Sequence, residues 1–156
     1  MFRGFIAQCS GHLLSRRNAL GLLLVVLPVS LGHAQEKPSF YVIAHPSTAA
    51  TSLPSRFVAD AFLKKVTRWE NGAAIYPVDL PSTSKTRVAF SDQVLKRSVA
   101  AVRSYWQQRI FSGRDVPPPE VDTESQVIKY VAGHPGALGY VSQSTELRGV
   151  KLIALQ

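Results

Sequence analysis

The sequence has 156 residues, with 18 Lys and Arg against 10 Asp and Glu and a single cysteine, Cys9. This length suits one domain of ordinary size. Lys and Arg are dispersed in runs of two at most and the sequence holds no RNA-binding signature, so nucleic acid is not an expected partner. A lone cysteine also excludes an intramolecular disulfide.

The first 34 residues have the pattern of a secretory signal peptide. Arg3, Arg16 and Arg17 precede an apolar run from Ala19 to Leu31, and Gly32-His33-Ala34 places small residues where a signal peptidase cuts. The run is shorter than the roughly 20 apolar residues of a membrane span. We expect cleavage near Ala34 and a periplasmic protein. An uncleaved anchor stays open as the alternative, and the Arg pair leaves open whether export is general or twin-arginine.

The chain after the leader, residues 35–156, is predicted to form one domain. Fifteen of the 18 Lys and Arg and all 10 Asp and Glu lie in it, which gives a net charge of +5. This modest positive charge suits an anionic ligand. Cys9 belongs to the leader, so thiol chemistry is not expected in the domain.

The first half of the domain is predicted to alternate between strand and helix. Aromatic and β-branched residues at 40–44 indicate a buried strand, which a hydroxyl-rich loop at 45–52 follows. Pro54 suits a helix start, and apolar residues at 3/4 spacing extend that helix to about residue 65. A second strand over 74–80 contains Pro77, which favours a position at the edge of a sheet.

The second half is predicted to hold three helices and two strands. The helices span residues 86–96, 98–110 and 123–131, and the strands span 138–141 and 150–155. Val102, Trp106 and Ile110 share one face of the second of these helices. Tyr105 and Phe111 are interpreted as packing groups as well. Alternating strands and helices predict an α/β fold with a mixed sheet.

One segment has the chemistry of an oxyanion site. Ser82-Thr83-Ser84-Lys85-Thr86-Arg87 sits at the predicted start of a helix. The first turn of a helix presents unpaired N–H groups and a partial positive charge, and hydroxyl and guanidinium donors add to both. An ordinary Ser/Thr cap followed by solvated cations is the alternative reading of the same residues.

Several short sequence motifs also follow one another along the chain in an order that is known from other proteins. Phe62 and Trp69-Glu70-Asn71-Gly72 come first, then Ser84-Lys85-Thr86 with Phe90, and later Gly136-Ala137-Leu138-Gly139-Tyr140-Val141. In this order the chain resembles the periplasmic phosphate-binding proteins of ABC transporters over residues 40–156. The resemblance implies one lobe of a type II periplasmic-binding-protein-like fold, since 122 residues provide room for only one of the two lobes of a typical member.

The resemblance implies which residues contact phosphate. Ser84 and Thr86 match the family's Ser-Gly-Thr, with Lys85 in place of Gly. The arginine of the family falls at Leu80, so Arg87 is expected to supply the cation instead. Ser47 and Thr48, in the loop after the first strand, are expected to approach the same helix end, with simple turn chemistry as the alternative.

An enzyme is not expected from this inventory of residues. Cysteine is absent after the leader, and His45 and His134 have no metal-ligand spacing. Asp79 and Glu120 could pair as carboxylates, but nothing in their spacing requires it. Neither a metal nor a cofactor is predicted.

Two functions follow. The first is a periplasmic solute-binding domain for phosphate or a similar small oxyanion, which would serve an inner-membrane transporter. The second is a ligand-free protein-interaction module of the cell envelope with the same fold. Pairing of two copies of the chain to rebuild a cleft is left open in both cases.

Overall fold

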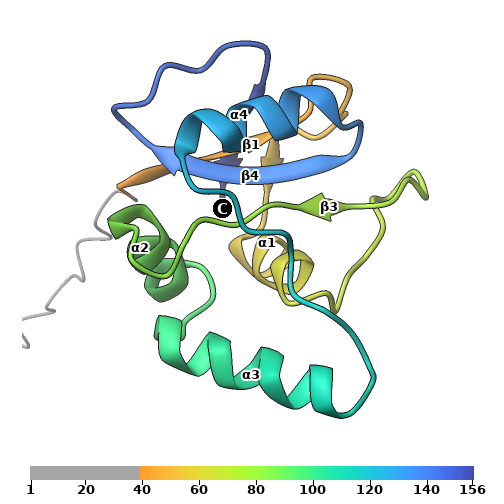
Figure 1. The fold of residues 1–156 in the computed structure, drawn as a ribbon. Coiled ribbons are helices and arrows are strands. Elements are labelled where there is room, and N and C mark those ends of the chain that lie inside the picture. The colour runs from red at the N-terminus through yellow and green to blue at the C-terminus, as the bar shows by residue number, and fades with distance from the viewer. Residues whose placement is uncertain (1–38) are drawn as a thin grey trace, which may run out of the picture. The chain divides into compact units, whose positions relative to one another are not determined.

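The computed structural model describes residues 39–156, so the predicted leader and its cleavage point lie outside the described residues. Five strands form one mixed sheet in the order β2-β5-β1-β4-β3 (Figure 1). They are β1 (Phe40–Ala44), β2 (Ser52–Leu53), β3 (Tyr76–Pro77), β4 (Ala137–Ser142) and β5 (Lys151–Leu155). The α/β class and the mixed sheet that the sequence predicts are confirmed.

Within residues 39–156, the central strand, β1, pairs only with strands from the last third of the chain. β1 is antiparallel to β4, with Phe40 opposite Ser142 and Ala44 opposite Leu138, and antiparallel to β5 on its other side. β3 is parallel to β4 and forms one edge of the sheet, as Pro77 predicts. β3 is shorter than the predicted strand: Ala74 and Asp79 make isolated bridges to other segments instead. β2, parallel to β5 at the other edge, was not predicted.

Four helices pack around this sheet. They are α1 (Ser55–Phe62), α2 (Lys85–Gln93), α3 (Val99–Phe111) and α4 (Glu124–Gly133). Figure 1 shows α4 on one face of the sheet and α1 and α2 on the other, with α3 lying beyond α2. Among residues 39–156, no helix combines the length and apolar character that crossing a bilayer requires.

An aromatic cluster joins the sheet to α1 and α2. The rings of Phe90 and Tyr140 stack with centroids 3.9 Å apart, and Phe62 lies 4.7 Å from Phe90. Phe40 meets the Phe90 ring edge-on at 5.5 Å. All four side chains are almost fully buried. Burial of a large aromatic side chain contributes about 1.5–3 kcal/mol, so this cluster fixes α2 against the sheet.

The predicted apolar face of α3 extends too far. Val102 and Trp106 are buried, but Ile110 is half exposed and Phe111 is 90% exposed. The predicted packing role of Phe111 is therefore wrong. Ile110 shares the face of Val102 and Trp106 but lies in the last turn of α3, whereas Phe111 lies about 180° around the helix axis from Val102.

Candidate functional site

Ser84 sets the start of α2. It adopts an extended backbone, and its hydroxyl accepts a hydrogen bond from the N–H of Arg87 at 3.3 Å. This cap leaves the N–H groups of Lys85 and Thr86 without an acceptor inside the helix. The partial positive charge of the helix end therefore coincides with the segment that the sequence singles out.

Thr86 donates to a carboxylate. Its hydroxyl binds Glu124 Oε1 at 2.6 Å, and the hydroxyl of Thr145 binds the other oxygen of the same carboxylate. Glu124 is the first residue of α4, which begins with a capping box formed by Thr123 and Gln126. The starts of α2 and α4 thus meet at one point, and the carboxylate of Glu124 lies between them.

Arg87 points inward. Its guanidinium forms an ion pair with Asp79, and both side chains are less than 10% exposed. Asp79 also accepts hydrogen bonds from the Tyr140 hydroxyl and, at 2.9 Å, from the N–H of Leu80. Burial raises the pKa of Asp79, an effect that the charge of Arg87 and these donors partly offset. The expected phosphate contact by Arg87 stays a prediction, and in this structure the side chain braces α2 against β4.

The position of Leu80 has a structural explanation. Its side chain is 1% exposed and belongs to the hydrophobic core. A guanidinium here would be buried among apolar groups at a high free-energy cost. The positively charged side chain of this region is therefore Arg87 of α2, which forms an ion pair with Asp79.

Ser47 and Thr48 lie at the other end of the sheet. They follow the end of β1, whereas Glu124 and Thr145 flank the end of β4 that pairs with the start of β1. Five residues of strand, roughly 13 Å, separate the two ends. The Ser47 hydroxyl contacts His45 Nδ1 at 2.7 Å, and Lys151 Nζ binds the Thr48 carbonyl at 2.7 Å. The structure therefore does not bring these two residues to the start of α2.

The side chains of Asp79 and Glu120, which the spacing neither requires nor excludes as a carboxylate pair, do not pair. The two residues form a backbone bridge, but the Asp79 carboxylate is buried against Arg87 while Glu120 is exposed. Within the described part of the chain, no three His, Cys, Asp or Glu side chains gather where they could hold a metal ion.

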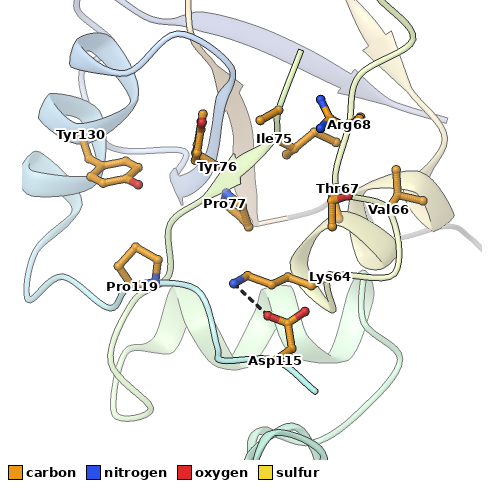
Figure 2. A pocket seen from close by; sticks show the side chains of 12 residues that line it. Lys64, Val66, Thr67, Arg68, Ile75, Tyr76, Pro77, Asp115, Pro119 and Tyr130 are labelled. Atoms are coloured by element: carbon orange, nitrogen blue, oxygen red, sulfur yellow. Dashed lines mark hydrogen bonds and ion pairs between the residues drawn. The ribbon is translucent and has the colours of Figure 1, made fainter. Parts of the chain in front are cut away.

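A separate cleft of about 350 Å³ lies beside the edge strand β3 (Figure 2). Lys64 and Asp115 form an ion pair across it at 3.2 Å, and Arg68, Tyr76 and Tyr130 contribute to its lining. These residues come from segments far apart in the sequence, so spacing alone gives no signal for this cleft.

Asp115 makes stability depend on pH. Partial burial would raise its pKa, but the Val116 N–H and the charges of Lys64 and Arg109 outweigh this, so the pKa is lowered. Such a group stabilises the fold above its unfolded pKa of about 3.9, and this contribution is lost as the pH falls through the lower folded value. We expect Asp115→Asn to lower the thermal midpoint at pH 7, and we expect its difference from the wild type to shrink as the pH falls below the unfolded pKa of about 3.9. The exposed Asp92→Asn is the control, and an unchanged midpoint for Asp115→Asn at pH 7 would contradict the assignment.

Comparison with solved structures places this fold. A candidate phosphate ABC transporter substrate-binding protein from Clostridium perfringens, solved with bound phosphate, matches 75% of the chain at 21% identity with a TM-score of 0.60. An ABC-type phosphate transport receptor from Vibrio cholerae (16% identity over 75% of the chain) and PstS from Borrelia burgdorferi (13% over 76%) each have a TM-score of 0.58. The chain spans 44%, 46% and 47% of these three structures. Neither a protein-family model nor a curated protein matches the sequence. The described domain has the fold of one periplasmic-binding-protein-like lobe.

Proposed function

We propose that this protein is a solute-binding domain of the cell envelope that binds phosphate or a similar small oxyanion at the start of α2. The N–H groups of Lys85 and Thr86 and the hydroxyls of Ser84 and Thr86 are the proposed contacts. A role in delivering or sensing the ligand for an inner-membrane transporter, rather than in catalysis, belongs to the same proposal. So does export to the periplasm by the N-terminal leader.

One observation carries this proposal. The Thr86 hydroxyl already donates to an anionic oxygen at 2.6 Å at the start of α2, where helix N–H groups are unpaired. A position that holds a carboxylate in this way has the donors and the potential that a phosphate oxygen requires. The likeness to phosphate-binding structures supports the same point, and the fold likeness alone would not name the ligand.

Thr86→Val tests the site directly. The substitution keeps the shape of the side chain and removes the donor. A hydrogen bond to a charged group contributes about 1.5–3 kcal/mol, so we expect phosphate affinity to fall at least tenfold. The measurement is titration calorimetry of the full-length protein with phosphate, with sulfate titrated in parallel to define selectivity.

Thr83→Val is the matched control, because Thr83 is an exposed threonine of the same loop. Its phosphate affinity should equal that of the wild type. Equal affinity of Thr86→Val and wild type would move the site elsewhere. A folded wild-type protein, shown by circular dichroism, that gives no saturable heat at millimolar phosphate would contradict the proposal. Arg87→Ala is not a useful probe, because it unpairs a buried carboxylate.

A ligand-free interaction module is the second candidate function. Ile110 and Phe111, at the end of α3, are 50% and 90% exposed, and Val116, in the loop that follows, is 60% exposed. Exposed large apolar side chains of this kind are candidates for a protein–protein contact. Under this alternative, Phe111→Ser would abolish binding to an envelope partner, and Thr86→Val would not affect it.

A further inference from the structure

We propose that the carboxylate of Glu124 is a built-in anion that occupies the oxyanion position at the start of α2, so that a ligand binds only by displacing it. This inference rests on the proposed function, whose site it shares. It adds a residue that competes with the ligand and thereby sets the affinity of the site.

The contacts of Glu124 are those of a bound oxyanion. Each of its two carboxylate oxygens accepts a hydrogen bond from a threonine hydroxyl, Thr86 at Oε1 and Thr145 at Oε2. The two hydroxyls come from α2 and from the segment after β4, so the carboxylate bridges two elements as a free tetrahedral or planar anion would. Glu124 makes no ion pair with Lys or Arg within the described residues. Hydroxyls and helix ends, rather than a cation, are what surround its charge.

Two helix starts stabilise a negative charge at this position. Glu124 is the first residue of α4, and its carboxylate reaches the second residue of α2. The N-terminus of each helix carries about half a positive charge, and the effect is strongest within the first turn. The position therefore favours an anion whichever group supplies it, and an incoming phosphate would place a second negative charge beside the first.

Displacement needs only a small movement. Glu124 is partly buried, and its backbone position is fixed by the capping box of α4 rather than by its own carboxylate. Rotation of this one side chain toward solvent would free the Thr86 hydroxyl as a donor beside the first N–H groups of α2. The Thr145 hydroxyl would then become a further donor to the ligand.

Glu124→Gln is the central test. The amide keeps the size of the side chain and an oxygen that accepts from one threonine, but it removes the charge. We expect the dissociation constant for inorganic phosphate, measured by calorimetry on the full-length protein, to fall at least about tenfold relative to wild type. Glu70→Gln is the matched control, because Glu70 is exposed and lies in the turn before β3, away from α2. It makes the same change in net charge and should bind phosphate as the wild type does.

The failures of the two proposals give different results. If wild type and Glu124→Gln bind phosphate equally, or the variant binds more weakly, the competing role of Glu124 is wrong while the proposed function stands. If neither folded protein binds phosphate, both proposals fail. If Glu124→Gln binds and wild type does not, the competing role of Glu124 is supported, because the wild-type site is closed by its own carboxylate, and the proposed function fails for the wild-type protein.

Glu124→Ala gives a second readout, which does not depend on phosphate binding. The truncation leaves the anion position open, so acetate, which carries the same carboxylate, should raise the thermal midpoint of this variant. Chloride at the same ionic strength controls for screening. Wild type and Glu124→Ala/Thr86→Val should not respond to acetate. An equal response of wild type and Glu124→Ala would overturn the inference.

Discussion

Replacing Arg87 with methionine is expected to lower the free energy of unfolding by about 3–5 kcal/mol, because it leaves a buried carboxylate without its cation. Arg87 and Asp79 are both more than 90% buried and form an ion pair. The remaining donors to Asp79, the Tyr140 hydroxyl and the Leu80 N–H, cannot neutralise its charge. Urea denaturation at pH 7, followed by circular dichroism, measures the change.

Arg56→Met is the matched control, because its side chain is 93% exposed although it forms an ion pair with Asp60. Its effect should stay within about 1 kcal/mol. Asp79→Leu combined with Arg87→Met removes both charges and should recover part of the loss. A loss below about 1 kcal/mol for Arg87→Met alone would show that the pair does not brace α2.

The stability of Arg87→Met should also depend on pH in a defined direction. Burial raises the pKa of Asp79 even beside Arg87, and without the cation this pKa rises further. An acid whose folded pKa lies above its unfolded value of about 3.9 binds more protons when folded, so stability falls as the pH rises between the two values. Arg87→Met should therefore lose less stability relative to wild type at pH 4 than at pH 7.

Gly136→Ala is the second substitution with a large expected effect. Gly136 has φ of +85°, and a Cβ placed there would lie 2.3 Å from the carbonyl oxygen of Ala74. That oxygen belongs to backbone, which cannot turn aside as a side chain could. Backbone strain and the overlap together should cost at least about 3 kcal/mol. Thermal and urea unfolding measure the loss.

Gly72→Ala separates the two causes. Gly72 has φ of +82°, but a Cβ there would meet no heavy atom within 4 Å. Its substitution should cost about 1–2 kcal/mol, from the backbone conformation alone. If Gly136→Ala costs no more than Gly72→Ala, the close approach of Gly136 to Ala74 is not a constraint on the fold.

Local sequence patterns predict most of the helices and strands, because the formation of these elements depends mainly on nearby residues. Hydrophobic periodicity and capping residues place the four helices to within a few residues at each end. β2 escapes prediction because two residues show no alternation, and its existence depends on β5, about a hundred residues later. At the end of α3, periodicity places Ile110 on the face of Val102 and Trp106 but does not show what covers it, whereas the same spacing places Phe111 on the opposite side of the helix from Val102.

At the candidate site too, local sequence predicts the helix start but not the partners of its side chains. A Ser cap followed by Thr and Arg is visible in the sequence, and the structure confirms the helix start at Ser84. The partners of these side chains are set by the fold: Arg87 meets Asp79, which precedes it by 8 residues, and Tyr140 of β4, and Thr86 meets Glu124, 38 residues away. Because tertiary packing decides these partners, spacing alone assigns Arg87 and Thr86 to a ligand and gives no signal for Glu124 or Thr145.

The pairing of β1 has a consequence for the time course of folding. Among the described strands this one comes first in the chain, yet both of its partners, β4 and β5, lie in residues 137–155. Until that last segment is available, the apolar Phe40–Ala44 stretch has no neighbour in the sheet. Contacts between such distant segments must be made against a large loop-closure entropy, which slows folding. The sheet is therefore completed only when the last segment is available, which leaves β1 exposed to aggregation in the meantime.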